Sequence, residues 1–470
     1  MSRTAKKIPP IIYILLGLLI WAGFKIYPKF FNRESSVPKI VKSKSSSVAD
    51  SFLANRVSWG ERLFIDSGKN FVPNSKQQGV AAFKQQNYQQ AVTYWQQSLA
   101  NFPNDPETVI YLNNAAIGDR QSYGIVVPVP LSTDTNTAQE ILRGVAQAQQ
   151  EINAQNGING IPLKVAIADD ANEPEIAQKL ARSFTANPDI LGVVGHFSSD
   201  VTLAAASVYE AAGLVVISPT STSVSIANAG DYIFRTVPSD RFAGNALARY
   251  FLETLNQQNA VIFYDSQSSY SKSLKDAFST DVVSNGGRIV TEFDLSDSNF
   301  DPATAVAQAR EDGAQALALL ATSSTLDSAL SVARANNRQL SLLAGDDVYT
   351  AKTLQTAGQV TTEMVVAIPW HIRGKVDANF PAAALSLWKG EVNWRTALAY
   401  DATQALIAGL KENPTRQGIQ EVLSASQFTV AGASGEISFL PSGDRNQKPQ
   451  LVRVQSGNNS GFGYDFAPIE

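Results

Sequence analysis

The chain has 470 residues, enough for about three ordinary domains, and its hydrophobic content of 44% against 17% charged residues is sufficient for a large buried core. Its net charge of -4 gives no support to a nucleic-acid partner. The absence of cysteine excludes disulfides, thiolate zinc sites and lipid attachment through cysteine, and two histidines are too few for a multi-histidine metal site. We therefore expect no cofactor and no metal.

The N-terminal segment carries an uncharged apolar run, Ile8–Phe24, behind three basic residues. A membrane span needs roughly 17–25 residues, so we expect a short tail at 1–8 and a transmembrane anchor at 9–28. A cleaved signal peptide is the alternative, but no small-x-small cleavage site follows the run. Residues 29–58 are rich in serine and predict a flexible tether. The flanking charges do not fix the orientation, but the shape of the segment is that of an export signal, so the body is expected in the periplasm or the extracellular space.

Residues 59–119 predict a helical hairpin. Gly79, Ala91, Trp95 and Pro103 have the spacing of a tetratricopeptide repeat, and the following residues resemble the first helix of a next unit. Only one complete repeat is visible, whereas arrays usually need about three. The hairpin either packs on the main body or serves as a docking site for a partner.

Residues 120–470 alternate short β-branched runs with amphipathic helical segments, which predicts an α/β fold with parallel sheets covered by helices. The pattern restarts near Asp240, and we therefore expect two similar lobes with a cleft between them. Lobe one would comprise about 120–238 and 370–435, and lobe two about 239–369 and 436–460. The predicted strands are Tyr123–Val129, Leu163–Asp169, Ile190–Val194, Leu214–Ser218, Ala260–Tyr264, Arg288–Phe293, Ala316–Leu320 and Leu340–Ala344.

Hydroxyl side chains follow two of the strands predicted for lobe one. Gly195-His196-Phe197-Ser198-Ser199-Asp200 follows the first of them, and we expect Ser199 to cap the next helix with its free N–H groups facing a ligand. Ser218-Pro219-Thr220-Ser221-Thr222 follows the second. Because ligands bind outside the carboxyl ends of parallel strands, both loops are candidates for one binding site.

The order of several motifs resembles the branched-chain amino-acid binding family, periplasmic solute-binding receptors of the type I fold. The resemblance covers about 123–439 and includes Glu151-Ile152-Asn153, Gly157-Ile158-Asn159-Gly160, Asp169-Asp170, the two hydroxyl loops, Phe234-Arg235-Thr236, Asp265 to Tyr270 and Gly345-Asp346-Asp347-Val348-Tyr349. It implies a substrate-binding protein for an amino-acid-like solute, closing by hinge motion and feeding an ABC-type transporter permease.

The resemblance also implies a role for five residues. Ser199 and Thr222 would hold the α-carboxylate of the ligand, and the Thr220 carbonyl with the Thr222 hydroxyl would hold its ammonium group. Asp346 would pair with the ammonium from lobe two, and Tyr270 would form an aromatic wall.

The sequence departs from the family in several places. Asp347 is a close alternative to Asp346, Thr322 stands where a second tyrosine is expected, and the loop Pro130–Ala138 has no aromatic residue. The frame for the amino-acid head therefore matches the family better than the pocket for the ligand side chain, and the sequence does not name the ligand.

The sequence leaves two other function classes open. A hydrolase could use Ser198 or Ser199 near His196, but the loop lacks the Gly-x-Ser-x-Gly pattern of a nucleophile elbow, and we expect no enzyme activity. A ligand sensor or scaffold could dock on another membrane protein, a sensor protein for example, through the helical hairpin.

Overall fold

The computed structural model describes residues 55–65, 73–374 and 379–469, which belong to one folded unit, Phe52–Glu470. The predicted anchor at 9–28 and most of the predicted tether lie outside these residues. Among the helices that are described, none combines the length and the apolar character needed to cross a bilayer.

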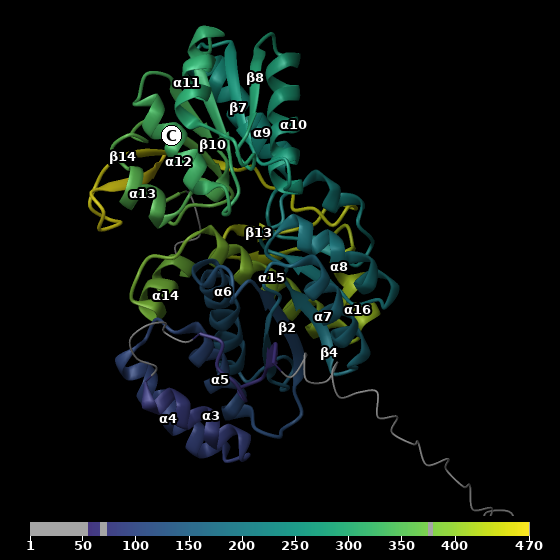
Figure 1. Ribbon diagram of the computed structural model, residues 1–470. Coiled ribbons are helices and arrows are strands. Elements are labelled where there is room, and N and C mark those ends of the chain that lie inside the picture. Colours follow the sequence, from purple (N-terminus) through teal and green to yellow (C-terminus); the bar gives the residue numbers. More distant parts are fainter. Residues whose placement is uncertain (1–54, 66–72, 375–378, 470) are drawn as a thin grey trace, which may run out of the picture. The chain divides into compact units, whose positions relative to one another are not determined.

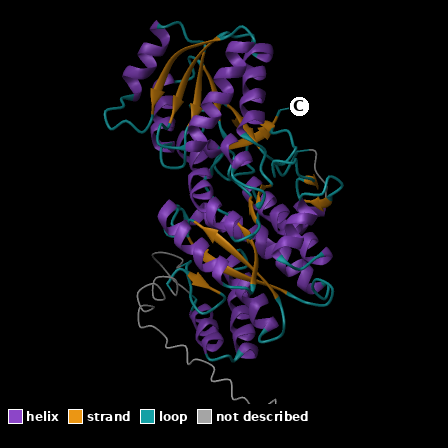
Figure 2. Ribbon diagram, turned by 90° about the vertical axis from the view of Figure 1, so that its right-hand side faces the viewer, coloured by secondary structure: helices purple, strands orange, loops and turns teal. Residues whose placement is uncertain are grey.

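Two sheets organise the described residues, one in each of two lobes (Figure 1, Figure 2). The lobe-one sheet has the order β1-β3-β2-β4-β5-β6, and all its pairs are parallel except β1 with β3. Its strands are β1 (Val57–Ser58), β2 (Tyr123–Val129), β3 (Leu163–Asp169), β4 (Ile190–Val194), β5 (Val216–Ser218) and β6 (Ile233–Arg235).

Helices cover both faces of this sheet. Successive side chains of a strand point to opposite faces, so neighbouring residues of β2 pack in different cores. Ile125 and Val127 of β2 pack with the core that includes α6 (Thr135–Ala154) and α15 (Trp394–Glu412). Val126 packs on the other side, with α7 (Pro174–Ala186) and α8 (Ser199–Ala211). A strand buried on both faces reads as a continuous apolar run, which is why these strands were predictable.

The lobe-two sheet has the order β15-β14-β11-β10-β9-β7-β8 among the described residues. Its strands are β7 (Asn259–Tyr264), β8 (Arg288–Asp294), β9 (Ala316–Leu320), β10 (Ser341–Ala344), β11 (Val365–Ile368), β14 (Gln450–Ser456) and β15 (Tyr464–Pro468). Its helices are α9 (Asp240–Arg249), the π-helical turn η2 (Tyr250–Thr254), α10 (Ser269–Ser284), α11 (Pro302–Glu311), α12 (Leu326–Asn336), the 3₁₀ turn η3 (Asp346–Val348) and α13 (Ala351–Ala357). The last two strands are antiparallel additions at one edge, and the sequence pattern predicted neither.

The chain crosses between the lobes after β6, after β11 and after β13. The second crossing returns it to lobe one, where it forms α14 (Asn379–Trp388), α15, α16 (Arg416–Leu423) and the small ribbon of β12 (Val430–Gly432) and β13 (Gly435–Ile437). The third crossing leads into β14 of lobe two.

The region predicted as a hairpin holds three helices: α3 (Asn74–Lys84), α4 (Tyr88–Asn101) and α5 (Pro106–Ile117). Gly79 lies against the Trp95 indole, which a side chain at that position would overlap. Lys76 is buried and forms ion pairs of 2.7 Å with Asp105 and 2.8 Å with Glu107. Burial lowers the pKa of Lys76, whereas the negative charges of Glu107 and Asp105 raise it. The carboxylates prevail, and the pKa of Lys76 is raised.

These helices are built into lobe one. Strand β1 pairs with β3 and forms one edge of the sheet. Asn114 of α5 donates to the carbonyls of Trp59 and Val165, both at 2.7 Å, and accepts from the Val165 N–H at 3.1 Å. The Asn114 amide thus forms hydrogen bonds with backbone groups of lobe one. The helices pack on the body, which was one of the two roles expected for the hairpin.

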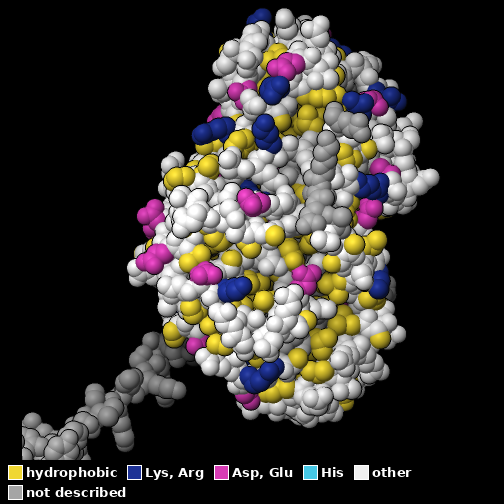
Figure 3. Space-filling model, turned by 180° about the vertical axis from the view of Figure 1, so that it is seen from behind, with side chains coloured by type: hydrophobic (Ala, Val, Ile, Leu, Met, Phe, Trp, Pro, Cys, Tyr) yellow, Lys and Arg dark blue, Asp and Glu magenta, His cyan; other side chains and the backbone are white. Residues whose placement is uncertain are grey.

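The surface seen in Figure 3 carries basic and acidic side chains that are interspersed rather than gathered by sign. This distribution agrees with the small net charge of -4. No field of one sign dominates that face.

Candidate functional site

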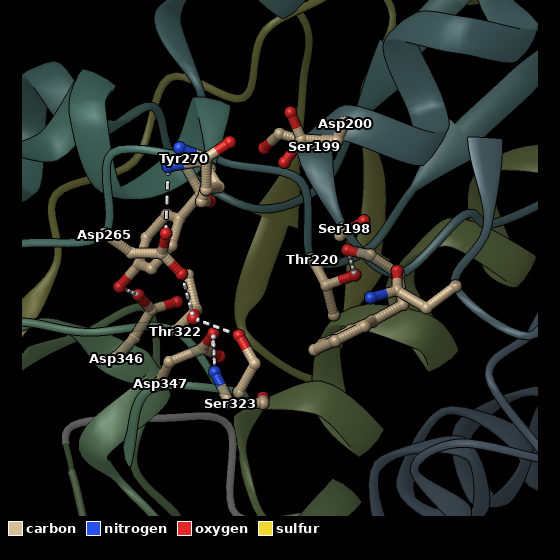
Figure 4. Close-up of a pocket in the computed structure, with 15 residues that line it drawn as sticks. Ser198, Ser199, Asp200, Thr220, Asp265, Tyr270, Thr322, Ser323, Asp346 and Asp347 are labelled. Atoms are coloured by element: carbon tan, nitrogen blue, oxygen red, sulfur yellow. Dashed lines mark hydrogen bonds between the residues drawn. The ribbon is translucent and has the colours of Figure 1, made fainter. Parts of the chain in front are cut away.

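A cavity of about 270 Å³ lies between the two lobes, at the carboxyl ends of their parallel strands. In Figure 4 the side chains of the two lobes face one another across it. Lobe one supplies Asn172, Phe197, Ser198, Ser199, Asp200 and Thr220; lobe two supplies Asp265, Gln267, Ser268, Tyr270, Thr322, Ser323, Ser324, Asp346 and Asp347.

The first hydroxyl loop leads into α8 one residue earlier than expected. Ser198, not Ser199, is the N-cap: its backbone is extended and its hydroxyl accepts from the Val201 N–H at 3.4 Å. Ser199 is the first helical residue, and its Oγ accepts from the Ser223 N–H at 3.1 Å. Because a hydroxyl also has one proton to donate, Ser199 can still donate to a group bound in the cavity.

The second hydroxyl loop is tied to the first. Thr220 Oγ1 donates to the Phe197 carbonyl at 2.7 Å, and Ser218 Oγ donates to the His196 carbonyl at 2.9 Å. The hydroxyl of Thr220 is therefore engaged within lobe one, although the residue lines the cavity. These bonds fix the position of one loop relative to the other.

Thr222 is buried but is not among the residues that line the cavity. Its carbonyl accepts from the Asp240 N–H at 2.8 Å, directly after the first crossing between the lobes. Burial raises the pKa of the Asp240 carboxyl to about 7, while the nearby hydroxyls of Ser273 and Thr222 act in the opposite direction. Thr222 is thus placed at the start of α9, beside a carboxyl group that belongs to lobe two.

His196 supports the first loop from behind. Its Nδ1 lies 2.7 Å from Asp170 Oδ2 and its Nε2 lies 3.0 Å from the Tyr209 hydroxyl, and the three side chains are buried. Both ring nitrogens are occupied by these partners, so His196 is not paired with Ser198 or Ser199. The serine–histidine arrangement that the hydrolase alternative needs is not formed in the described loop.

Tyr270 and Asp346 form the wall of lobe two. The Tyr270 hydroxyl donates to Asp346 Oδ1 at 2.6 Å. Gly345 makes room for this contact, since a Cβ there would lie 2.5 Å from the Tyr270 oxygen. Burial, and then the negative charge of Asp347, raise the pKa of Asp346 to about 6, and burial raises the pKa of Tyr270 well above its usual value.

The neighbouring carboxyl group of Asp347 has a different partner. Its Oδ1 lies 2.8 Å from Arg395 of lobe one, and its Oδ2 accepts from the Ser323 N–H at 3.2 Å. Within the part of the chain that the structure describes, Asp347 has a cationic partner and Asp346 has none. This favours Asp346 over Asp347 as the counter-charge for a bound ammonium group.

The two lobes are in direct contact around the cavity. Asp200 at the start of α8 accepts from the Ser269 N–H at the start of α10, at 3.1 Å from each carboxylate oxygen. The Val224 N–H donates to Ser273 Oγ at 2.9 Å. With the Asp347–Arg395 pair, these bonds hold lobe one against lobe two.

The charge of the cavity is one-sided. Its lining contains the aspartates Asp200, Asp265, Asp346 and Asp347, whereas no lysine or arginine of the described residues lines it. Such a lining favours a ligand that carries positive charge.

Of the five residues to which the resemblance assigns a role, Ser199, Thr220, Tyr270 and Asp346 line the cavity and Thr222 does not. Asp200, Ser323 and Ser324 line it without having been singled out. Asp200 carried a usable signal, because an acidic residue in the first turn of a helix at a strand end was visible. Arg395 lies far along the chain in α15, and no sequence signal pointed to it.

The fold and the site define a two-lobed solute-binding protein. The sequence model of the periplasmic binding protein family matches residues 123–460. The chain belongs to this family.

Several named proteins are similar to it. The Leu/Ile/Val-binding protein of Escherichia coli K12 is 29% identical over 308 residues, which cover 64% of this chain and 82% of that protein. An amino acid binding protein of Pseudomonas aeruginosa is 32% identical over 174 residues, and the match spans 37% of this chain and 46% of that protein.

Solved structures share the fold. An ABC transporter substrate-binding protein from Desulfitobacterium hafniense, in complex with Leu, has a TM-score of 0.63 at 24% identity, covering 74% of this chain and 100% of that one. A solute-binding protein from Rhodopseudomonas palustris, in complex with 3,4-dihydroxybenzoic acid, has a TM-score of 0.64 at 17% identity, covering 74% and 97%.

Proposed function

We propose that this chain is an extracytoplasmic substrate-binding protein for an amino-acid-like solute and that it delivers the solute to an ABC-type permease. The observation that carries the proposal is the pair of unlike walls around one cavity: hydroxyls and a helix N-terminus on lobe one, Asp346 with Tyr270 on lobe two. The similarity to a Leu/Ile/Val-binding protein supports it.

The walls suit the two ends of a zwitterion. The first N–H groups of α8 and the Ser199 hydroxyl would hold the α-carboxylate. Asp346 would accept from the ammonium group, and the Thr220 carbonyl would do so from lobe one. Charge-assisted hydrogen bonds of this kind are each worth about 1.5–3 kcal/mol. Thr222 would act at the edge of the site, beside Asp240.

Because the ligand would contact both lobes at once, binding would favour the closed arrangement over an open one. The bound solute would thus add its contacts to those that already join the lobes. Nothing in this mechanism requires a bond to be made or broken, and we propose that the chain is not an enzyme.

Isothermal titration calorimetry on the full chain tests the proposal with a panel of L-amino acids. Ser199→Ala should weaken binding by about tenfold or more, which corresponds to the loss of one such hydrogen bond. Ser207→Ala, on an exposed position of the same helix, is the matched control and should bind as the unmodified chain does. Binding of no amino acid, or an unchanged affinity in Ser199→Ala, would refute the assignment.

The membrane attachment is a second part of the proposal. We propose that residues 9–28 anchor the chain with its body outside the cytoplasm, since the run is apolar and relatives of this family are periplasmic. Without protease, the chain should be found in the membrane fraction. Protease added to intact spheroplasts should then digest the body. A body protected from protease until the cells are lysed would contradict this topology.

A further inference from the structure

Two carboxylates of the cavity have no part in the proposed function. Asp346 is assigned to the α-ammonium group, and Asp347 lies 2.8 Å from Arg395. Asp200 of lobe one and Asp265 of lobe two line the same cavity. The zwitterion of an α-amino acid uses its single ammonium group at Asp346 and brings no further positive charge for these two.

Both carboxylates lie at the start of α10, and they reach it from different lobes. Asp265 Oδ1 accepts from the Gln267 N–H at 2.9 Å. Asp200 accepts from the Ser269 N–H, at 3.1 Å from each carboxylate oxygen. Two N–H groups that are two residues apart lie within about 7 Å of one another. The two carboxylates therefore border the same end of the cavity.

The partners that the described residues provide for these two carboxylates are uncharged. Asp200 accepts from one backbone N–H, and Asp265 accepts from one backbone N–H and from the Thr322 hydroxyl at 2.8 Å. An ionised carboxylate offers about four lone-pair sites, so each of the two can accept further hydrogen bonds. A cationic donor forms a stronger bond with a carboxylate than a neutral donor does. This end of the cavity is thus suited to an ammonium group.

Three basic residues lie near this site but belong to an adjoining cavity. Arg143, Lys352 and Arg395 line that cavity, which has a volume of about 630 Å³. Each of them forms an ion pair with another carboxylate, at 2.6 to 2.8 Å. Their charges are matched by those carboxylates, and the charges of Asp200 and Asp265 are left for a ligand.

The strand order sets the spacing between this end of the cavity and Asp346. Asp346 follows β10, Asp265 follows β7, and β9 lies between these two strands in the sheet. Neighbouring strands lie about 4.7–4.9 Å apart, so the two residues leave the sheet about 10 Å from one another. Each ammonium–carboxylate contact takes up about 2.8 Å of this distance. A short aliphatic chain between two ammonium groups spans the rest.

An organic cation matches these carboxylates better than a metal ion does. In the part of the chain that the structure describes, no three carboxylate or histidine side chains are placed so that they could hold a metal ion together. The cavity of about 270 Å³ lies just below the usual range of about 300–1,000 Å³ for small-molecule pockets. It therefore fits a molecule of the size of an amino acid.

We propose that the ligand carries a second positive charge and is an α-amino acid with a short cationic side chain, with ornithine as the representative chemistry. This rests on the proposed function, because the α-ammonium and α-carboxylate groups are held as described there. The side-chain ammonium group lies between Asp200 and Asp265. Since these residues belong to different lobes, the second charge also favours the closed arrangement.

Calorimetry on the full chain tests this with three L-amino acids that share one carbon chain. These are ornithine, norvaline, which lacks the side-chain ammonium group, and citrulline, in which an uncharged ureido group replaces it. Ornithine should bind at least about tenfold more tightly than either of the others, as expected for one additional charge-assisted hydrogen bond. Citrulline separates the effect of charge from that of side-chain length.

Asp200→Asn and Asp265→Asn each remove a charge and keep a side-chain oxygen for the present N–H partner. Each should bring the affinity for ornithine close to that for norvaline. The ratio of the two affinities is the measured quantity, because norvaline makes every other contact and reports any general loss of binding. Glu311→Gln, at an exposed position at the end of α11, is the matched control and should keep the ratio. Thermal unfolding shows that each variant is folded.

The outcomes separate the two proposals. If norvaline or citrulline binds as tightly as ornithine, or if either folded variant keeps the ratio of the unmodified chain, the ligand has no second cationic group at this site and the proposed function stands. If none of the three probes and no other amino acid binds, the proposed function is refuted and this inference with it.

Discussion

The Asp347 carboxylate of lobe two lies 2.8 Å from the Arg395 guanidinium of lobe one, so this ion pair joins the two walls of the cleft. Both side chains are largely buried, at 14% and 3% exposure. The guanidinium also lies 4.3 Å from the centroid of the Trp394 ring. The pair can form only while the lobes are together, and it therefore belongs to the closed arrangement.

Breaking this pair should weaken ligand binding. Asp347→Asn or Arg395→Met alone leaves an uncompensated buried charge or polar group, and we expect either to reduce affinity by about tenfold. The double variant should lose less than the two single variants added together. Calorimetry on the four proteins measures this coupling. Arg249→Met, at the exposed pair with Glu253, is the control and should change affinity by less than about twofold. Strictly additive losses would show that the pair does not couple the lobes.

Ligand affinity should depend on the ionisation of Asp346. Its pKa is raised to about 6 by burial and by Asp347, so the carboxyl is protonated below that pH and cannot pair with an ammonium group. Affinity should be constant well above pH 6 and should fall by about tenfold per pH unit below it. Titrations between pH 4.5 and 8 test this, and Asp346→Asn should bind weakly with no such slope. An affinity that stays constant down to pH 4.5 would exclude Asp346 from the ammonium site.

Stability should fall with rising pH through Asp240. The pKa of this carboxyl is raised from 3.8 to about 7 by burial, so the folded state holds the proton more tightly than the unfolded state does. Its stabilising contribution is complete below about pH 4 and is lost as the pH rises through 7. Asp240→Asn, which resembles the protonated form, should therefore raise the melting temperature at pH 8 and change it little at pH 4. The exposed Asp189→Asn should show no such difference, and a melting temperature shifted equally at both pH values in Asp240→Asn would contradict the prediction.

The packing of α6 on α15 depends on Gly144. A Cβ at this position would overlap the Thr396 carbonyl oxygen and come within 2.6 Å of the Tyr400 nitrogen. Gly144→Ala should destabilise the fold by about 1–3 kcal/mol, the usual cost of overpacking. Gly390→Ala, where nothing lies within 4 Å of the added carbon, should be near neutral. Urea denaturation of both variants decides between them, and equal midpoints would show that the helices can move apart without cost.

Much of the fold could be predicted because buried parallel strands are apolar throughout. Tyr123–Val129, Leu163–Asp169 and Ile190–Val194 were predicted with the bounds that the structure has. β6 and β11 were missed, as were β14 and β15. β6 and β11 are buried and parallel but have only three and four residues, too few to stand out as strands, whereas β14 and β15 form a partly exposed antiparallel pair at the sheet edge. The helix α9 that begins at Asp240 continues into the π-helical turn Tyr250–Thr254, which local composition does not encode.

The candidate site divides in the same way. The sequence by itself determined that hydroxyl loops follow two strands of lobe one, and hence that Ser199 and Thr220 would lie close together, because strand direction fixes which end of a sheet receives its loops. The places of Tyr270 and Asp346 came from the resemblance to the family. The sequence did not determine which serine caps α8. The helix begins at Ser199, so the cap is Ser198 rather than the expected Ser199.

Only the tertiary structure decided how the two walls meet. It turned Thr222 toward Asp240, paired Asp347 with Arg395 from a helix 48 residues further along the chain, and opened a second cavity behind Phe197. These relationships depend on how lobe one and lobe two close on one another. Such long-range placement is set by the packing of whole elements, and local residue patterns carry no record of it.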